Sequence, residues 1–210
     1  MRRVHRLVLV PILVGVGVTL IRVTGEVQGW IATTSGGALH PLGVTWLVLV
    51  FGAWFGYRLG SEGAVERPAR ALGFGLLALG IVLAALAGAS ALFAGTFVGI
   101  AVSAMLAASV AALLPRRAAP VLFAANVAFA LPVRIVIILV TTVSVLAGWG
   151  THYEKMGPEN ALVETTKLGT IVGYAFFHLL FWVPVSAILG SITGGVGAWI
   201  ARRRALAPVA

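Results

Sequence analysis

The sequence contains no cysteine and no aspartate, and it has few charged residues of any kind. Charged side chains make up 10% of the 210 residues, and all six acidic ones are glutamates. A soluble domain carries roughly 25% charged residues. The missing cysteines exclude disulfides, iron–sulfur clusters and cysteine-based zinc sites, and the missing aspartates exclude mechanisms that need a catalytic Asp. The chain therefore lacks the polar surface that a soluble protein of this size needs.

Long apolar runs, in contrast, are abundant. Hydrophobic residues make up 60% of the chain, and the mean hydropathy is +1.05. A membrane-spanning helix needs about 20 mostly apolar residues, which predicts an all-α polytopic membrane protein with six transmembrane helices in a single domain over residues 1–210. The predicted spans are roughly 4–24, 40–60, 69–89, 92–114, 120–148 and 169–200, with an outer loop over 151–168. The last span is longer than a bilayer requires, and we expect it to tilt, protrude or break near Gly194-Gly195.

Basic residues are distributed unevenly over the predicted loops. Eleven of the fifteen fall on one side, whereas Arg22, Lys155 and Lys167 fall on the other. This bias predicts that both termini are cytoplasmic, in the plasma membrane of a bacterium or archaeon. We expect the basic loops to meet anionic lipid headgroups, so membrane lipids are predicted partners. Because these charges are spread over four short loops, the sequence does not favour a nucleic-acid partner.

Small residues recur once per turn in three of the predicted spans. Such stripes let helix backbones approach closely in a membrane. We therefore expect a glycine-zipper type of contact among spans two, three and four, and the same faces could join copies or partner chains in an oligomer. The stripes comprise Gly52, Gly56 and Gly60, then Gly80, Ala84 and Gly88, and then Gly95, Gly99, Ser103, Ala107 and Ala111.

Arg134 lies near the middle of the fifth predicted span. Placing a cation close to the bilayer midplane costs at least about 2.5–3.5 kcal/mol, and no glutamate lies in the core of any predicted span. Its partners must therefore be carbonyls, neutral polar groups, water or a bound anion. Pro132 frees the carbonyl of Ala128 from its helical hydrogen bond, and this carbonyl is one candidate acceptor.

Polar residues accompany Arg134 on one face of the same predicted helix. At 100° per residue, Asn126, Thr141 and Ser144 fall with Arg134 in one arc of about 80°. This stripe either lines a water-filled cavity with Arg134 as an anion anchor, or forms a buried hydrogen-bond network between helices. Three further residues fall on the outer half of other spans. The complete set of predicted substrate-binding residues is Arg134, Asn126, Thr141, His178, Tyr174 and His40.

The outer loops carry weaker signals. His152 and Glu154 have an H-x-E spacing that could supply two metal ligands, but no H-E-x-x-H motif accompanies them, and we predict no metal site. Glu26 follows Arg22 by four residues, which predicts an ion pair. The segment Gly157-Pro158-Glu159 predicts the start of a short helix over the outer mouth. No cofactor is predicted, since no lysine lies inside a span to form a Schiff base.

Three functions remain open on the sequence alone. The first is a small transporter or substrate-binding membrane subunit, whose outward-facing polar cavity binds an anionic or amphipathic small molecule. The second is a structural or assembly subunit of a larger membrane complex, which does not explain the cost of burying Arg134. The third is an intramembrane enzyme that acts on a lipid or isoprenoid at the outer leaflet, with His40, His152, Glu154 and His178 as acid–base or metal-binding groups. We favour the first, and therefore a protein that is not an enzyme.

Overall fold

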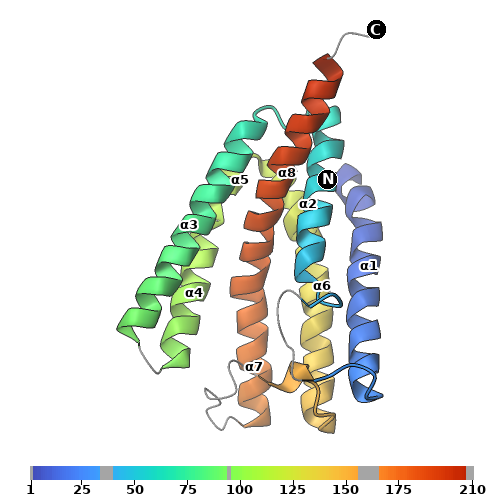
Figure 1. Ribbon diagram of the computed structural model, residues 1–210, viewed down its shortest axis with the longest axis vertical. Coiled ribbons are helices and arrows are strands. Elements are labelled where there is room, and N and C mark those ends of the chain that lie inside the picture. The colour runs from blue at the N-terminus through green and yellow to red at the C-terminus, as the bar shows by residue number, and fades with distance from the viewer. Residues whose placement is uncertain (1, 34–39, 94–95, 156–165, 207–210) are drawn as a thin grey trace.

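The computed structural model describes residues 2–33, 40–93, 96–155 and 166–206, and this part of the chain is helical without strands (Figure 1). The predicted short helix at Gly157-Pro158-Glu159 lies outside the described residues, as does Gly95. The elements, in chain order, are α1 (Arg2–Val27), α2 (Thr45–Ser61), α3 (Pro68–Leu92), α4 (Phe97–Ala111), α5 (Leu113–Ala118), α6 (Pro120–Ala147), the 3-10 turn η1 (His152–Glu154), α7 (Lys167–Phe177), the π-helical segment η3 (His178–Trp182) and α8 (Val183–Leu206).

Among the described residues, five helical stretches are long and apolar enough to cross a membrane. They are Val4–Val27, Pro68–Leu92, Phe97–Ala118, Pro120–Ala147 and Lys167–Leu206. The apolar helix α2 has 17 residues, which corresponds to roughly 25 Å at 1.5 Å per residue. The helix boundaries follow local signals in the sequence. Proline stands at the first position of α3 and of α6, where its missing N–H costs nothing, and α6 ends at Gly148 in a left-handed conformation.

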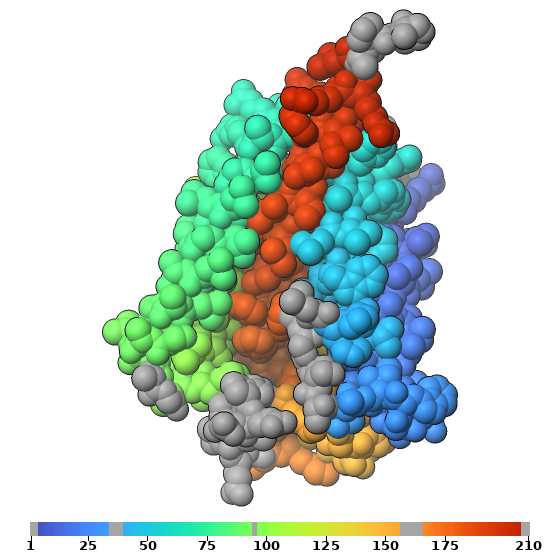
Figure 2. Space-filling model, in the orientation of Figure 1, coloured from blue at the N-terminus to red at the C-terminus, as the bar shows by residue number. Residues whose placement is uncertain are grey.

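Helix α8 runs through the middle of the bundle, between α2 and α3 (Figure 1). Along the face shown in Figure 2, its side chains fill the seam between these two helices. The expectation of close contacts among spans two, three and four is therefore wrong for α2, which packs on α8. It is right for α3 and α4, which lie side by side after a short connection. Helix α1 packs against α6 at the edge of the bundle.

The glycine stripe of α2 explains the close contact with α8. A Cβ added to Gly56 would lie 1.8 Å from the Gly194 carbonyl oxygen, and one added to Gly52 would lie 2.6 Å from the Gly190 Cα. This stripe is therefore covered within the chain. Gly80 and Gly88 of α3, in contrast, have no atom within 4 Å of an added Cβ, so their stripe faces outward.

The irregular part of the last helix lies near its outer end. Of the alternatives expected for the long last span, a break at Gly194-Gly195 is wrong, because both residues are buried inside the continuous helix α8. The helix is instead π-helical over His178–Trp182, two residues before Pro184. Proline has no N–H to donate to the carbonyl four residues earlier, which belongs to Leu180. The Ser109 hydroxyl of α4 donates to this carbonyl at 2.9 Å.

Candidate functional site: a buried polar stripe

The polar stripe of α6 faces the interior of the bundle. Asn126, Arg134, Thr141 and Ser144 are all buried on the side of α6 that packs against α1 and α8. Asn126 lies directly on α8, because a Cβ added to Gly190 would come within 2.2 Å of its side-chain oxygen. The stripe is thus held between three helices, away from the outward-facing leucine and valine side chains of α6.

Arg134 is 4% exposed and lies midway along α6. Its guanidinium carbon stands 4.9 Å from the ring centre of Trp182, in the π-helical segment. A cation over an indole face is attracted by the ring quadrupole, and this contact orients the side chain toward α7 and α8. Within the described part of the chain, its Nη2 atom has no hydrogen-bond partner, so the carbonyl of Ala128 does not satisfy it.

Three more buried polar atoms resemble Nη2 of Arg134 in lacking a partner among the described residues. They are Oδ1 of Asn126, Oγ1 of Thr141 and Nδ1 of His178. We call these four residues the inner polar cluster. A buried polar group without a hydrogen bond costs about 1–3 kcal/mol, and native structures contain few such groups. The four atoms all belong to residues that the sequence predicts to bind substrate.

The inner polar cluster is elongated along the bundle axis. Asn126 and Arg134 are eight residues apart on α6, and their contacts on the antiparallel last helix, Gly190 and Trp182, are also eight apart. The 15 residues from Asn126 to Thr141 correspond to roughly 22 Å of helix. This length is a large part of a hydrocarbon core of about 30 Å. The four atoms that lack a partner among the described residues are therefore spread along the helix axis and are not gathered at one depth.

His178 occupies the first position of the π-helical segment. Its ring stacks on the ring of Tyr174, with 5.8 Å between the centroids and 18° between the planes. A π-helical turn changes the direction of the side chains that follow, and such turns are frequent at functional sites. Here it brings His178 and Trp182 to the part of the core that contains Arg134.

Residues 151–155, which we call the outer cap, cover the outer end of these helices. Thr151 and Tyr153 are buried. The Glu154 carboxylate accepts hydrogen bonds from the Ser144 hydroxyl at 2.7 Å and from the Thr151 main-chain N–H at 3.2 Å. The Tyr174 hydroxyl donates to the carbonyls of His152 and Lys155. The outer cap is thereby attached to α6 and α7.

Glu26 attaches the outer cap to α1. Its Oε1 atom accepts from Nε of Arg22 at 2.9 Å, which confirms the predicted ion pair, and lies 2.5 Å from Nδ1 of His152. Its Oε2 atom accepts the His152 main-chain N–H at 2.9 Å. His152 and Glu154 are thus bonded to different protein groups, Glu26 on one side and Ser144 with Thr151 on the other. The predicted H-x-E pair is used to hold the outer cap in place.

Burial governs the titration of the outer cap. It lowers the pKa of the His152 imidazole, and the hydrogen bond to Glu26 only partly offsets this effect. Burial also raises the pKa of the Tyr153 phenol, and the positive charges of Arg22 and Arg134 oppose this rise only in part. The Arg134 charge is therefore felt at the base of the cap. The favoured state of the cap contains a neutral His152 that donates its Nδ1 proton to the Glu26 carboxylate.

The six predicted binding residues fall into two groups. Asn126, Arg134, Thr141 and His178 form the inner polar cluster, with Tyr174 stacked at its outer edge through His178. His40 lies elsewhere, before α2, where its Nδ1 atom accepts the Leu42 N–H at 3.1 Å. Sequence reasoning missed the contact of Trp182 with Arg134, although Pro184 is a signal of irregular helix nearby.

Comparison of the chain with protein-family models, with curated proteins and with solved structures finds no match. The function must therefore be argued from the site itself.

Proposed function

We propose that this protein is a small membrane transporter, or the substrate-binding membrane subunit of one, that carries an anionic, amphipathic small molecule past Arg134. In this proposal six helices span the plasma membrane, both termini are cytoplasmic, and the outer cap closes the outward side. The observation that carries the proposal is a row of four buried polar atoms, on Asn126, Arg134, Thr141 and His178, that have no partner among the described residues. Arg134 supplies the positive charge, and Trp182 beside it supplies an apolar surface.

The length of the inner polar cluster favours transport over the alternatives. A structural subunit gains nothing from polar atoms that cost about 1–3 kcal/mol each, whereas a permeant anion bonds them in turn as it moves along the roughly 22 Å from Thr141 to Asn126. The acid–base groups that an enzyme at the outer leaflet would use are not gathered in one place. Glu154 bonds Ser144 and Thr151, whereas His152 bonds Glu26 of α1, and among the described residues no three histidines or glutamates could hold a metal ion together.

Entry from the outer side requires movement of the outer cap. It is attached by hydrogen bonds to Glu26, Ser144 and Tyr174. A hydrogen bond contributes about 0.5–1.5 kcal/mol net, or about 1.5–3 kcal/mol when one partner is charged, so release of the cap requires several kcal/mol of binding energy. The proposed cycle therefore couples anion binding at Arg134 to opening of residues 151–155.

Saturable binding of octanoate tests the proposal. Octanoate combines a carboxylate with an apolar chain, and its binding to the purified protein in nanodiscs is followed by tryptophan fluorescence, to which Trp182 contributes. We expect Arg134→Gln to weaken saturable binding at least about tenfold, the loss of one charge-assisted bond, and Arg134→Lys to keep part of it. Arg116→Gln on α5 is the control of equal charge change and should bind normally. Normal binding by a folded Arg134→Gln variant contradicts the proposal.

Folding is measured in parallel by size-exclusion chromatography and thermal unfolding. If Arg134→Gln fails to fold, Thr141→Val tests the same cluster without removing the charge. Uptake into proteoliposomes of octanesulfonate, which stays charged and therefore does not cross a bilayer as a neutral acid, then separates the two forms of the proposal, because a transporter moves this anion by itself and a binding subunit does not.

A further inference from the structure

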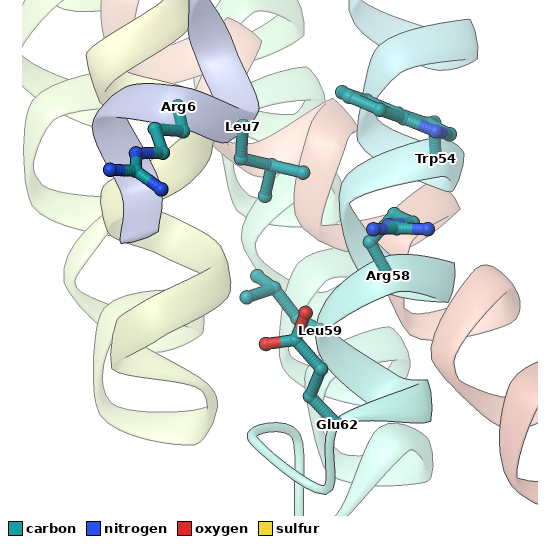
Figure 3. A pocket seen from close by; sticks show the side chains of 6 residues that line it. All are labelled: Arg6, Leu7, Trp54, Arg58, Leu59 and Glu62. Atoms are coloured by element: carbon teal, nitrogen blue, oxygen red, sulfur yellow. The ribbon is translucent and has the colours of Figure 1, made fainter. Parts of the chain in front are cut away.

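A groove at the other end of the bundle holds a second concentration of positive charge. It lies between the start of α1 and the end of α2, has a volume of about 510 Å³, and is lined by Arg6, Leu7, Trp54, Arg58, Leu59 and Glu62 (Figure 3). All six residues come from one end of the bundle (Figure 1). This is the end that the distribution of basic residues predicts to be cytoplasmic.

The groove combines ionic and apolar walls. Arg6 stands on the α1 side and Arg58 on the α2 side, while Leu7 and Leu59 lie between them (Figure 3). Trp54 lies one turn from Arg58 on α2 and is 39% exposed. With Glu62 included, the formal charge of the lining is +1. This composition matches a ligand with one negative charge next to an apolar chain.

The two arginines of the groove differ from those that end the chain. In the described part of the chain, the guanidinium groups of Arg6 and Arg58 have neither a hydrogen-bond nor an ion-pair partner. Arg202, in contrast, donates to the Glu66 carbonyl, and Arg203 stacks on the ring of Trp199. Arginine forms two parallel bonds to phosphate oxygens, so these two free side chains suit a phosphodiester.

We infer that this groove is a binding site for an anionic phospholipid, with the headgroup held at the arginines of its two walls, Arg6 and Arg58, and an acyl chain along Leu7 and Trp54. Basic pockets between helices at the cytoplasmic surface suit acidic headgroups, and indole rings are favoured at the membrane interface. The apolar wall is what distinguishes a lipid from free phosphate as the ligand. The inference is independent of the proposed transport function, because it uses none of the inner polar cluster.

Native mass spectrometry of the full chain tests this site with phosphatidylglycerol, phosphatidylcholine and inorganic phosphate as separate probes. We expect one tightly held phosphatidylglycerol. Each arginine near an anionic headgroup is worth about a five- to tenfold change in binding, so Arg6→Gln with Arg58→Gln should weaken binding roughly thirtyfold. Arg116→Gln with Arg117→Gln removes the same charge from α5 at the same end of the bundle, and it should change the affinity less than threefold.

Each other outcome overturns the inference. Equal losses in the two double variants mean that only the overall surface charge attracts the lipid. Binding of inorganic phosphate with an affinity like that of the lipid means a free-anion site without acyl contacts. Normal lipid binding by a folded Arg6→Gln, Arg58→Gln variant means that the groove is not the site. Should that variant not fold, the single variants Arg6→Gln and Arg58→Gln replace it, each with an expected five- to tenfold loss of affinity for phosphatidylglycerol, and normal binding by both contradicts the inference.

Discussion

Arg134 and Trp182 face each other at mid-bundle, with 4.9 Å between the guanidinium carbon and the ring centre. A desolvated cation–π contact is worth about 2 kcal/mol, whereas an arginine at the bilayer centre costs at least about 2.5–3.5 kcal/mol. The indole therefore offsets only part of the cost. No described residue bonds Nη2, so in the proposed function a bound anion offsets the remainder, and anion binding at this position is the central test.

Two adjacent threonines on α6 provide the cleanest comparison within the inner polar cluster. Oγ1 of Thr141 is buried and has no partner among the described residues, while Thr142 donates to the Ile138 carbonyl at 2.8 Å. We expect Thr141→Val to leave stability unchanged or slightly raised but to weaken octanoate binding about three- to tenfold. Thr142→Val should bind octanoate normally. Equal affinities of the two variants in a titration would argue against a ligand at Thr141.

Alanine at Gly56 should separate α2 from α8. The added Cβ would lie 1.8 Å from the Gly194 carbonyl oxygen, and backbone atoms cannot yield locally. Overpacking costs typically 1–3 kcal/mol and occasionally more, and we expect a loss of about 3 kcal/mol in the free energy of unfolding by titration with sodium dodecyl sulfate. Gly80→Ala on α3, where the added Cβ meets nothing within 4 Å, is the control and should unfold like the original chain.

The hydrogen bond from Ser109 to the Leu180 carbonyl should stabilise the fold only because Pro184 cannot donate a main-chain N–H to that carbonyl. Ser109→Ala leaves this carbonyl without its side-chain donor, and we expect a loss of about 0.6 kcal/mol, the average for such bonds in membrane proteins. Pro184→Ala restores a main-chain N–H four residues after Leu180. In that background Ser109→Ala should cost nothing. The coupling is measured as a double-mutant cycle, and full additivity would show that Pro184 is not the reason for the bond.

Acid should loosen the outer cap. Burial holds the pKa of His152 below its ordinary value, despite the bond to Glu26 and with Arg22 and His40 nearby. The cap's stability is therefore complete above the ordinary histidine pKa of about 6.5 and declines as the pH falls below it, because the released ring binds a proton more readily. Amide hydrogen exchange in residues 151–155 should rise between pH 7.5 and pH 5.5, relative to its intrinsic pH dependence.

The matched variants for this prediction are His152→Gln, which keeps a donor for Glu26 but does not titrate in this range, and His5→Gln at the other end of α1. The first should remove the excess exchange at pH 5.5, and the second should retain it. Retention of the full pH effect in His152→Gln would assign the effect to another group.

Local periodicity predicts much of this structure, and contacts between distant segments account for what it misses. The polar stripe on α6 follows from the spacing of Asn126, Arg134 and Thr141 along one helix. The joint between Glu26 and His152 does not, because 126 residues separate them and no pattern connects them. The α2–α8 contact had a signal that remained unused: Gly190, Gly194 and Ala198 repeat at the same spacing of four as Gly52, Gly56 and Gly60.

The contact between Gly56 and Gly194 limits how this molecule can change shape. Two helices whose main chains touch cannot slide or rotate past each other without first coming apart. Helices α2 and α8 therefore move as one rigid unit. Any rearrangement that exposes Arg134 to one side of the membrane and then to the other must occur in the α1–α6 pair or in the segment before Pro184. The α2–α8 pair is then the fixed frame against which those parts move.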